Sequence, residues 1–434
     1  MIDMHPGYKQ SEVVRLTDVI GIGVLTRVVT QEIVDDVLLR TGSKEIRKRG
    51  LPARVVVYFV LAMALFSRDS YEEVMRKLVQ GLRSIPVLRT DWEVPTSSAF
   101  SKARTRLGVE PMREIFDRVA VPCAMLSTDG AFRRGRRLMA LDGVELDAPD
   151  TPENAERFGY SGVKKKERSA FVKVPAMALA ECGTHAVVEV EVGTTADSEH
   201  ALVDRLVSLT DKLGPGMLVL TDRGLYSHDL LSKIVQTGAD ACMRVPATLD
   251  LPVLAWCPDG SFLSYVAEPD AKTRARRGLA SGKTSITDLP GTHVRVVEYD
   301  VPNRGDKSKR ELFALVTNIT DPDEMPSFDL AEAYHDRWEI EVTFDEIKTH
   351  QRGGAVVLRS KLPDLVLQEL YGYLITHHAI RHLMTEAADQ AELDPDRLSF
   401  TRSLNIIRRQ VTSQAAFSPS DAGDGPHRNN QGDG

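Results

Sequence analysis

The stretch Leu138-Met139-Ala140-Leu141-Asp142-Gly143 is the part of the chain that decides its fold. Four consecutive apolar residues followed by an aspartate and a glycine are typical of a buried β-strand that ends at a turn. The pattern occurs a second time, where the apolar run from Met217 to Thr221 leads into Asp222-Arg223-Gly224. We therefore expect two buried strands, each with an aspartate at its end.

The segments around these two strands predict an α/β domain. Asp197-Ser198 is a good helix N-cap, and Glu181-Cys182-Gly183-Thr184-His185 is suited to the turn of a hairpin. The expected additional strands are Phe171 to Ala180, Ala186 to Val192 and Asp240 to Val245, and the expected helices are His200 to Leu213 and His228 to Gln236. The order strand, strand, strand, helix, strand, helix, strand is that of a ribonuclease-H-like domain.

The rest of the chain divides by hydrophobic period. Apolar residues recur at helical spacing from Leu16 to about Ala120 and again after Asp329, whereas residues 247 to 326 alternate as strands do. The expected domains are a helical N-terminal DNA-binding domain (1–130), a first catalytic part (131–246), a β-rich insertion (247–326), a second, helical catalytic part (327–415) and a disordered tail (416–434).

Composition excludes several classes of protein. The chain has 434 residues, of which 42% are hydrophobic and 27% charged, so it can form two or three domains. Its most apolar stretch, Leu51 to Phe66, is shorter than a membrane-spanning helix, and a signal peptide is absent, so we expect a cytoplasmic protein without membrane contact. The four cysteines lie far apart with no nearby histidine cluster, which argues against a zinc finger or a disulfide scaffold.

Positive charge is clustered although the formal net charge is −7. Clustered Lys and Arg are what phosphate contacts need, although each run could equally be a solvated loop. Lys102, Arg104 and Arg106 are suited to phosphate contact on one helix, with a plain surface helix as the alternative. The other basic runs are 44–49, 133–137, 164–166, 274–277 and 307–310.

Asp142 and Asp222 are candidate ligands for divalent cations. In a ribonuclease-H-like sheet their two strands are neighbours, so the carboxylates should meet at one edge. Two Mg²⁺ or Mn²⁺ ions roughly 3.5–4 Å apart suit phosphoryl transfer on DNA, and Mg²⁺ prefers oxygen ligands. Each aspartate alone is also common turn material.

A polar stripe on a later helix supplies the third acid. Tyr334, Arg337, Glu341 and Lys348 fall within about 60° of one another on an α-helix. Glu341 would be the remaining metal ligand, Arg337 and Lys348 would hold phosphates, and Tyr334 would hydrogen-bond the DNA backbone. The alternative is a solvent-facing helix with an Arg337–Glu341 ion pair. Trp338 could stack on an unpaired base or pack in the core.

These residues resemble the Y-x2-R-x3-E-x6-K signature of the insertion-element-4 family of DDE transposases. Leu141-Asp142-Gly143 with residues 147–154 resembles the family's first catalytic segment, and Thr221 to Ser227, which includes the candidate DNA contact Arg223, resembles its second. Val144 departs from the hydroxyl residue expected after Asp-Gly. The resemblance covers nearly the whole chain apart from the tail.

The resemblance implies cut-and-paste movement of an insertion element. Such an enzyme binds terminal inverted repeats, cleaves the DNA strands and joins the freed ends to target DNA, with a homodimer in the synaptic complex. Some members open their ends through a DNA hairpin, in which Trp338 would receive a flipped base. Two alternatives remain at this point: a catalytically silent repressor derived from a transposase, and a ribonuclease-H-like nuclease that only hydrolyses DNA.

Overall fold

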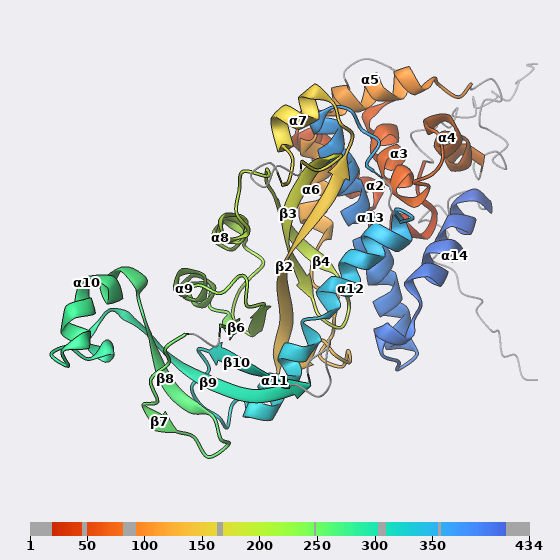
Figure 1. The fold of residues 1–434 in the computed structure, drawn as a ribbon. Helices are drawn as coiled ribbons and strands as arrows, with labels where there is room; N and C mark the ends of the chain where they lie inside the picture. Colours follow the sequence, from red (N-terminus) through yellow and green to blue (C-terminus); the bar gives the residue numbers. More distant parts are fainter. Residues whose placement is uncertain are drawn as a thin grey trace, which may run out of the picture.

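A large mixed sheet forms the centre of the molecule, with helices on both of its faces (Figure 1). The computed structural model describes residues 20–45, 50–80, 93–162, 168–246, 249–302, 310–354 and 357–413. The expected disordered tail, 416–434, lies outside these residues. None of the helices within the described ranges combines the length and apolar character needed to cross a membrane.

Five strands form the ribonuclease-H-like part of the sheet in the order β4-β3-β2-β5-β6. β2 and β5 are parallel, β5 and β6 are parallel, and β3 is antiparallel to both β2 and β4. The fold class expected from the sequence is therefore confirmed. These strands are β2 (Arg136–Ala148), β3 (Val172–Glu181), β4 (Val187–Val192), β5 (Met217–Thr221) and β6 (Asp240–Val245), and the short β1 (Phe132–Arg133) pairs with β2.

β2 is apolar on both faces because helices cover both. Successive side chains of a strand point to opposite faces. Leu138 and Ala140 belong to the core beneath the N- and C-terminal helices, whereas Met139 and Leu141 pack with α8 (Glu199–Leu209) and α9 (His228–Gln236). The Ser198 and Ser227 hydroxyls cap α8 and α9 by accepting from the backbone N–H groups of Ala201 and Leu230.

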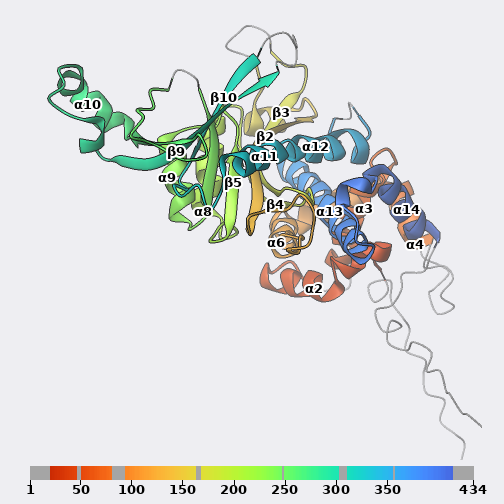
Figure 2. The ribbon, with the colours of Figure 1, turned by 90° about the horizontal axis from the view of Figure 1, so that it is seen from below.

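The helical N-terminal region shares its core with helices from the other end of the chain. α3 is buried along nearly its whole length, and α13 packs against both α3 and α6 (Figure 2). A fragment ending at residue 130 would expose this apolar surface, so DNA binding is best measured on the full chain. The helices are α2 (Gln31–Arg40), α3 (Ala53–Leu65), α4 (Tyr71–Gln80), α5 (Ser97–Leu107), α6 (Glu110–Val119), α13 (Pro363–Gln390) and α14 (Phe400–Ser413), with the 3₁₀ turn η1 (Gly23–Arg27) before them.

Arg104 belongs to this shared core and not to a DNA-facing surface, which corrects the interpretation of α5. Its side chain is fully buried and donates hydrogen bonds to Gln368, Ser360 and the carbonyl of Leu365. Arg106 donates to the carbonyl of Leu51, and Lys102 is exposed. Of the three residues of α5 that the sequence suggested for phosphate contact, Lys102 is therefore the one whose exposed side chain still suits that interpretation.

The β-rich insertion continues the central sheet. Its strands extend the order from β6 through β10, β9 and β8 to β7. They are β7 (Ala255–Trp256), β8 (Phe262–Ala267), β9 (Gly291–Pro302) and β10 (Arg310–Thr317). The insertion also contains a helix that the strand pattern did not predict, α10 (Pro269–Ala280), which lies at the far end of the molecule from the N-terminal helices (Figure 1).

Candidate active site

The two aspartates lie side by side on neighbouring strands. The last pairs in the parallel β2–β5 ladder are Ala140 with Leu220 and Leu141 with Thr221. Asp142 and Asp222 are the next residues on strands that run about 4.8 Å apart. The expectation that β2 ends at Asp142 is wrong, because β2 continues to Ala148 against β3. It is β5 that stops, so the pair lies where β2 loses one of its neighbours.

The third acid follows a break between two helices. α11 (Ser327–Asp336) and α12 (Glu339–Asp345) are separated at Arg337 and Trp338, and the π-helical turn η5 (Glu346–Gln351) follows α12. Across the break, the backbone N–H groups of Arg337, Trp338, Ile340 and Glu341 donate to carbonyls three residues back. The expected single α-helix from Tyr334 to Lys348 is therefore wrong: the backbone winds more tightly before Glu341 and more loosely after it.

Arg337 connects the aspartate of β2 to the glutamate of α12. Its Nη1 lies 3.6 Å from Oδ2 of Asp142, and its Nη2 donates to Oε1 of Glu341 at 3.3 Å. The guanidinium side chain is 7% exposed, whereas Glu341 is 44% exposed. The sequence predicted a phosphate contact for Arg337; in the structure its partners are these two carboxylates.

The carboxylates form a site of concentrated negative charge. Burial raises the pKa of Asp142 to about 6, and the charges of Asp222 and Glu341 act in the same direction, against Arg337 and the Gly143 N–H. Asp142 Oδ1 accepts from that N–H at 2.8 Å, and Asp222 Oδ1 accepts from the N–H of Leu225 at 3.0 Å. A bound cation would favour the ionised form of Asp142 and offset the effect of burial and of the two neighbouring acids.

The donor set fits a hard divalent cation. Three carboxylates from three elements provide only oxygen ligands, which Mg²⁺ and Mn²⁺ prefer. One cationic side chain, Arg337, already lies between two of them and offsets only part of their charge. The residues present are therefore compatible with bound divalent metal.

The remaining predicted residues of the site lie in different surroundings. Tyr334 is 4% exposed, and the centre of its ring lies 6.3 Å from that of Phe313. Burial raises the pKa of Tyr334 to about 12. Its side chain is therefore part of the hydrophobic core. Trp338 is half-buried, with the Arg337 guanidinium 5.4 Å from its ring centre. Arg223 is exposed beside Asp222.

Lys348 lies further along β2 than the acids. Burial and then the charge of Arg352 lower the pKa of Lys348, which the nearby Glu145 and Asp147 partly oppose. Both acids belong to the end of β2 beyond Asp142. Lys348 is therefore half-buried among both acidic and basic side chains. It does not lie on the same polar face of a helix as Glu341.

The arginines of the basic run at 133–137 form ion pairs with acidic side chains of the same chain. Arg133 pairs with Glu332, Arg134 with Asp329 and Arg136 with Asp240, at 3.1, 2.6 and 2.6 Å. Arg137 pairs with the buried Glu181. These ion pairs connect β1 and β2 to α11 and β6. The runs at 46–49, 164–166 and 307–309 lie outside the described residues, whereas Arg274, Arg276 and Arg277 are exposed on α10.

A buried ionic cluster that the sequence did not indicate lies under α12 and η5. Glu346, the first residue of η5, accepts hydrogen bonds from Arg381 and His377 of α13. His185, in the β3–β4 turn with φ 58°, lies 3.6 Å from Glu346 and 3.2 Å from Asp396. The cluster joins η5, which directly follows α12, to α13 and to this turn, and is therefore placed to hold the helical segment that carries Glu341.

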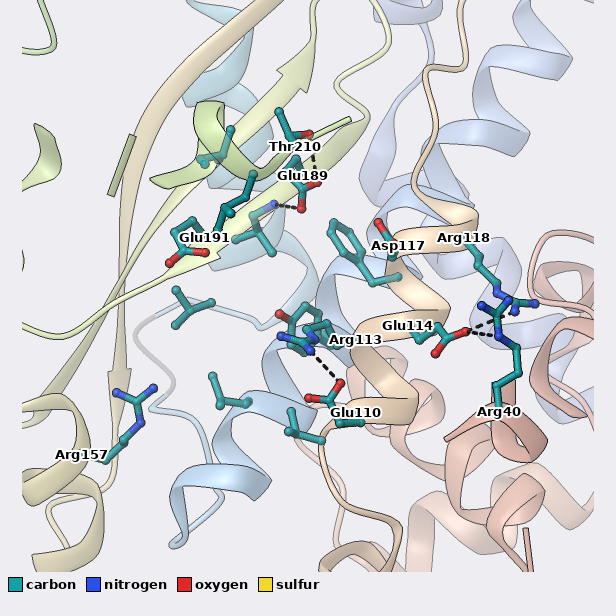
Figure 3. Close-up of a pocket in the computed structure, with 18 residues that line it drawn as sticks. Arg40, Glu110, Arg113, Glu114, Asp117, Arg118, Arg157, Glu189, Glu191 and Thr210 are labelled. Carbon is teal, nitrogen blue, oxygen red and sulfur yellow. Dashed lines mark hydrogen bonds and ion pairs between the residues drawn. The ribbon is translucent and has the colours of Figure 1, made fainter. Parts of the chain in front are cut away.

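A large pocket lies elsewhere, between α6, β4 and α13 (Figure 3). It measures about 780 Å³, and none of Asp142, Asp222 and Glu341 lines it. Its charged side chains pair among themselves, as in Arg113 with Glu110 and Arg118 with Glu114. The pocket belongs to the junction between the helices and the sheet and not to the acid site.

A sheet of this order, with aspartates side by side on its two central parallel strands and a glutamate on a following helix, defines the ribonuclease-H-like class of phosphoryl-transfer enzymes. Two family models match the chain. The model described as "Insertion element 4 transposase N-terminal" matches residues 19–117, and "Transposase DDE domain" matches residues 133–376. The chain belongs to the insertion-element-4 family of DDE transposases. It is an insertion-sequence DNA transposase, a metal-dependent enzyme that cleaves DNA.

Individual proteins are similar to much of the chain. Transposase InsG for insertion sequence element IS4 of Escherichia coli (strain K12) is 27% identical over 391 residues, which cover 89% of this chain and 82% of that protein. The putative transposase InsZ of the same organism is 25% identical over 226 residues, 50% of this chain and 68% of that protein. A cryo-EM structure of a piggyBac transposase synaptic complex with hairpin DNA aligns with 90% of this chain and 79% of its own, at 11% identity and TM-score 0.45.

Proposed function

We propose that this transposase binds the terminal inverted repeats of its element, cleaves the DNA strands and joins the freed ends to target DNA at a site formed by Asp142, Asp222 and Glu341. The observation that carries the proposal is the convergence of these residues: Asp142 and Asp222 continue paired strands, and Arg337 contacts both Asp142 and Glu341. The three carboxylates are proposed to hold two Mg²⁺ or Mn²⁺ ions. When bound, such ions activate the attacking oxygen and stabilise the leaving one.

The protein's own residues position these ligands. Asp142 and Asp222 are held by the strands and by backbone N–H donors, so little ordering remains when DNA arrives. Glu341 is more exposed than Asp142, the other acid that Arg337 contacts. The Arg337 guanidinium holds the Glu341 side chain in place. Arg337 thereby keeps two like-charged groups close together, and a scissile phosphate bound at the acids would lie within reach of the same guanidinium.

The proposed DNA contacts are exposed cations near the acids and on the insertion. Arg223 follows Asp222 directly, and Arg274, Arg276 and Arg277 are exposed on α10 at a distance from the acids. Lys348 is proposed to reach a backbone phosphate further along β2. Because two element ends must be brought together, we propose a homodimer in the synaptic complex. We place the reaction in the cytoplasm.

The reaction is tested with the full chain, a donor DNA that carries the element ends, and a separate target. In Mg²⁺ or Mn²⁺ we expect cleavage at both ends followed by joined products. Cleavage that never yields joined products would favour the nuclease alternative. Binding of the ends without cleavage in either metal would favour the repressor alternative. Binding should weaken steeply with salt, since it depends on phosphate contacts.

We predict that Trp338 acts on a displaced base if the ends open through a hairpin. The residue is half-buried, lies three residues before Glu341, and has the Arg337 guanidinium over its ring. Trp338→Ala is expected to slow hairpin formation or opening by roughly 10- to 100-fold, because a base–aromatic stack contributes about 1–3 kcal/mol. First-strand nicking should change little. Equal losses in every step together with a lower melting temperature would assign Trp338 to core packing, and Trp338→Phe should retain most of the activity.

A further inference from the structure

Cys123, His378 and His382 come together at the junction between the helical region and the catalytic sheet. The Sγ atom of Cys123 lies 3.8 Å from Nε2 of His378, and the ligand atoms of all three residues lie within 4.8 Å of one another. Cys123 belongs to the segment between α6 and β1, and the histidines occupy consecutive turns of α13. The sequence shows no histidine cluster near a cysteine because these residues are about 255 positions apart in the chain and meet only in the fold.

From this geometry we propose that Cys123, His378 and His382 bind one Zn²⁺ ion, separate from the site of the three acids. Thiolate and imidazole are the donors that zinc prefers, and a fourth position is left for water. In a tetrahedral zinc site with ordinary bond lengths, sulfur and nitrogen ligands are about 3.6 Å apart. The Cys123–His378 distance is close to this value.

The tautomer of His378 suits metal binding. Its Nδ1 lies 3.2 Å from the carbonyl oxygen of Val187, the first residue of β4, which can only accept. The proton is therefore on Nδ1, and the lone pair of Nε2 faces Cys123. Metal-binding histidines are commonly oriented by this kind of outer hydrogen bond. Burial, followed by the charges of His382 and His377, lowers the pKa of His378 to about 3, so the ring is neutral at neutral pH.

The backbone at Cys123 is also fixed in position. The N–H groups of Cys123 and Ala124 donate to Oε2 of Glu181 at 2.8 and 3.0 Å, and Glu181 is itself buried and paired with Arg137. Burial raises the pKa of the Cys123 thiol well above its ordinary value. On binding, Zn²⁺ would replace the thiol proton, which leaves to solvent as one H⁺ per ion.

A second group of potential ligands, His185, Glu339 and Asp396, lacks this arrangement. There, Nδ1 of His185 faces the guanidinium of Arg381, which can only donate. Burial and the charge of Arg381 oppose ionisation of His185, but hydrogen bonds to Asp396, 3.2 Å from Nε2, and to Glu346 outweigh them and raise the pKa of His185. The protonated ring, which has no lone pair for a metal, is therefore favoured. This group is better described as an ionic cluster. A neutral imidazole whose lone pair faces a cysteine is what distinguishes the zinc site from this cluster.

The proposal is tested by metal content and by cobalt substitution in the full chain. Protein purified without chelator should contain about one zinc per chain, and Co²⁺ in its place should give a near-ultraviolet sulfur-to-metal charge-transfer band. That band requires a thiolate ligand, so ions at the three acids cannot produce it. Cys123→Ser should remove the band, and His382→Gln should weaken zinc binding by more than the roughly 10- to 100-fold that loss of an outer hydrogen bond costs.

Matched variants keep the result interpretable. Cys257→Ser and His350→Gln change a cysteine and a histidine outside the cluster and should leave both readouts as they are. His378 is fully buried, so Cys123 and His382, which are half-buried, are the safer positions to replace. Chelator should lower the melting temperature of the wild type more than that of Cys123→Ser. A zinc content unchanged in Cys123→Ser, or cobalt binding without the charge-transfer band, would mean that Cys123 and His378 share only a hydrogen bond.

Discussion

Asp142→Asn, Asp222→Asn and Glu341→Gln are each expected to lower the rate of strand cleavage by at least about 1,000-fold, since a lost metal ligand removes several kcal/mol of charge stabilisation and each 1.4 kcal/mol is tenfold in rate. DNA binding should be kept or become slightly tighter, because a negative charge beside the phosphates is removed. Cleavage assays in Mg²⁺ and Mn²⁺, paired with gel shifts on the same protein, measure both effects.

Two exposed acids provide the controls for this experiment. Asp229→Asn, in the first turn of α9, matches Asp222→Asn, and Asp345→Asn, one turn after Glu341, matches Glu341→Gln. Both controls should cleave at a rate close to that of the wild type. A Glu341→Gln enzyme that cleaves as fast as Asp345→Asn would remove Glu341 from the proposed site.

The pKa of Asp142 adds a pH dependence to the same set of variants. Burial raises this pKa in the folded protein from 3.8 to about 6. Since the folded value lies above the unfolded one, metal-free protein loses stability as the pH rises through this window, by about 3 kcal/mol in total. Asp142→Asn should not show this loss, and added Mg²⁺ should reverse it in the wild type. Chemical unfolding at pH 4 and pH 7, with and without Mg²⁺, measures the difference.

The sequence predicted the catalytic fold well because its signals are local. The apolar run from Met217 to Thr221 and the helix from His228 to Gln236 have the bounds that the structure shows for β5 and α9. A short apolar run between turn residues is typical of a buried strand. The Ser227 hydroxyl caps α9 by accepting from the N–H of Leu230, only three residues further along the chain. For α10 a local signal was present, because Pro269 occupies its first turn.

Features that depend on distant partners could not be predicted. Arg104 and Lys102 look alike in the sequence, but Arg104 is buried against residues of α13 and the segment before it, more than 250 positions away. The break at Arg337 contains no glycine or proline, the usual sequence signals of a helix break. The acid site was predicted through two local strand patterns, whereas the supporting cluster of His185, Glu346 and Arg381 has no local pattern at all.

The stability of the fold is expected to depend on that cluster. Glu346→Ala is expected to lower the free energy of unfolding by about 3–5 kcal/mol, because it leaves the buried charge of Arg381 without its partner. Arg381 is 2% exposed and donates through Nε to Glu346 at 2.9 Å, and the fully buried His377 contacts the same carboxylate at 2.9 Å. Chemical unfolding at pH 7 measures the loss, with Asp345→Asn, the exposed neighbouring residue, as the control expected to stay within about 0.5 kcal/mol.

The same carboxylate gives the cluster a predictable pH dependence. Burial alone would raise the pKa of Glu346, but hydrogen bonds from His185 and His377 and the charge of Arg381 outweigh it and hold the pKa well below 4.5. Because the folded value lies below the unfolded one, the stabilisation is complete above about pH 5 and is lost as the pH falls. Glu346→Ala should therefore differ most from the wild type near neutral pH and least in acid.

A double variant separates the pair from its surroundings. Replacing both partners, as in Glu346→Leu with Arg381→Met, removes the unpaired charge together with its partner, so the double variant should be more stable than Glu346→Ala alone. Recovery of stability without recovery of cleavage would mean that the ionic cluster also positions α12, since Glu341 lies five residues before Glu346 on the same helical segment. A Glu346→Ala protein that unfolds within about 1 kcal/mol of the wild type would show that Arg381 finds another partner, and the cluster would lose its proposed role in fixing the helix of Glu341.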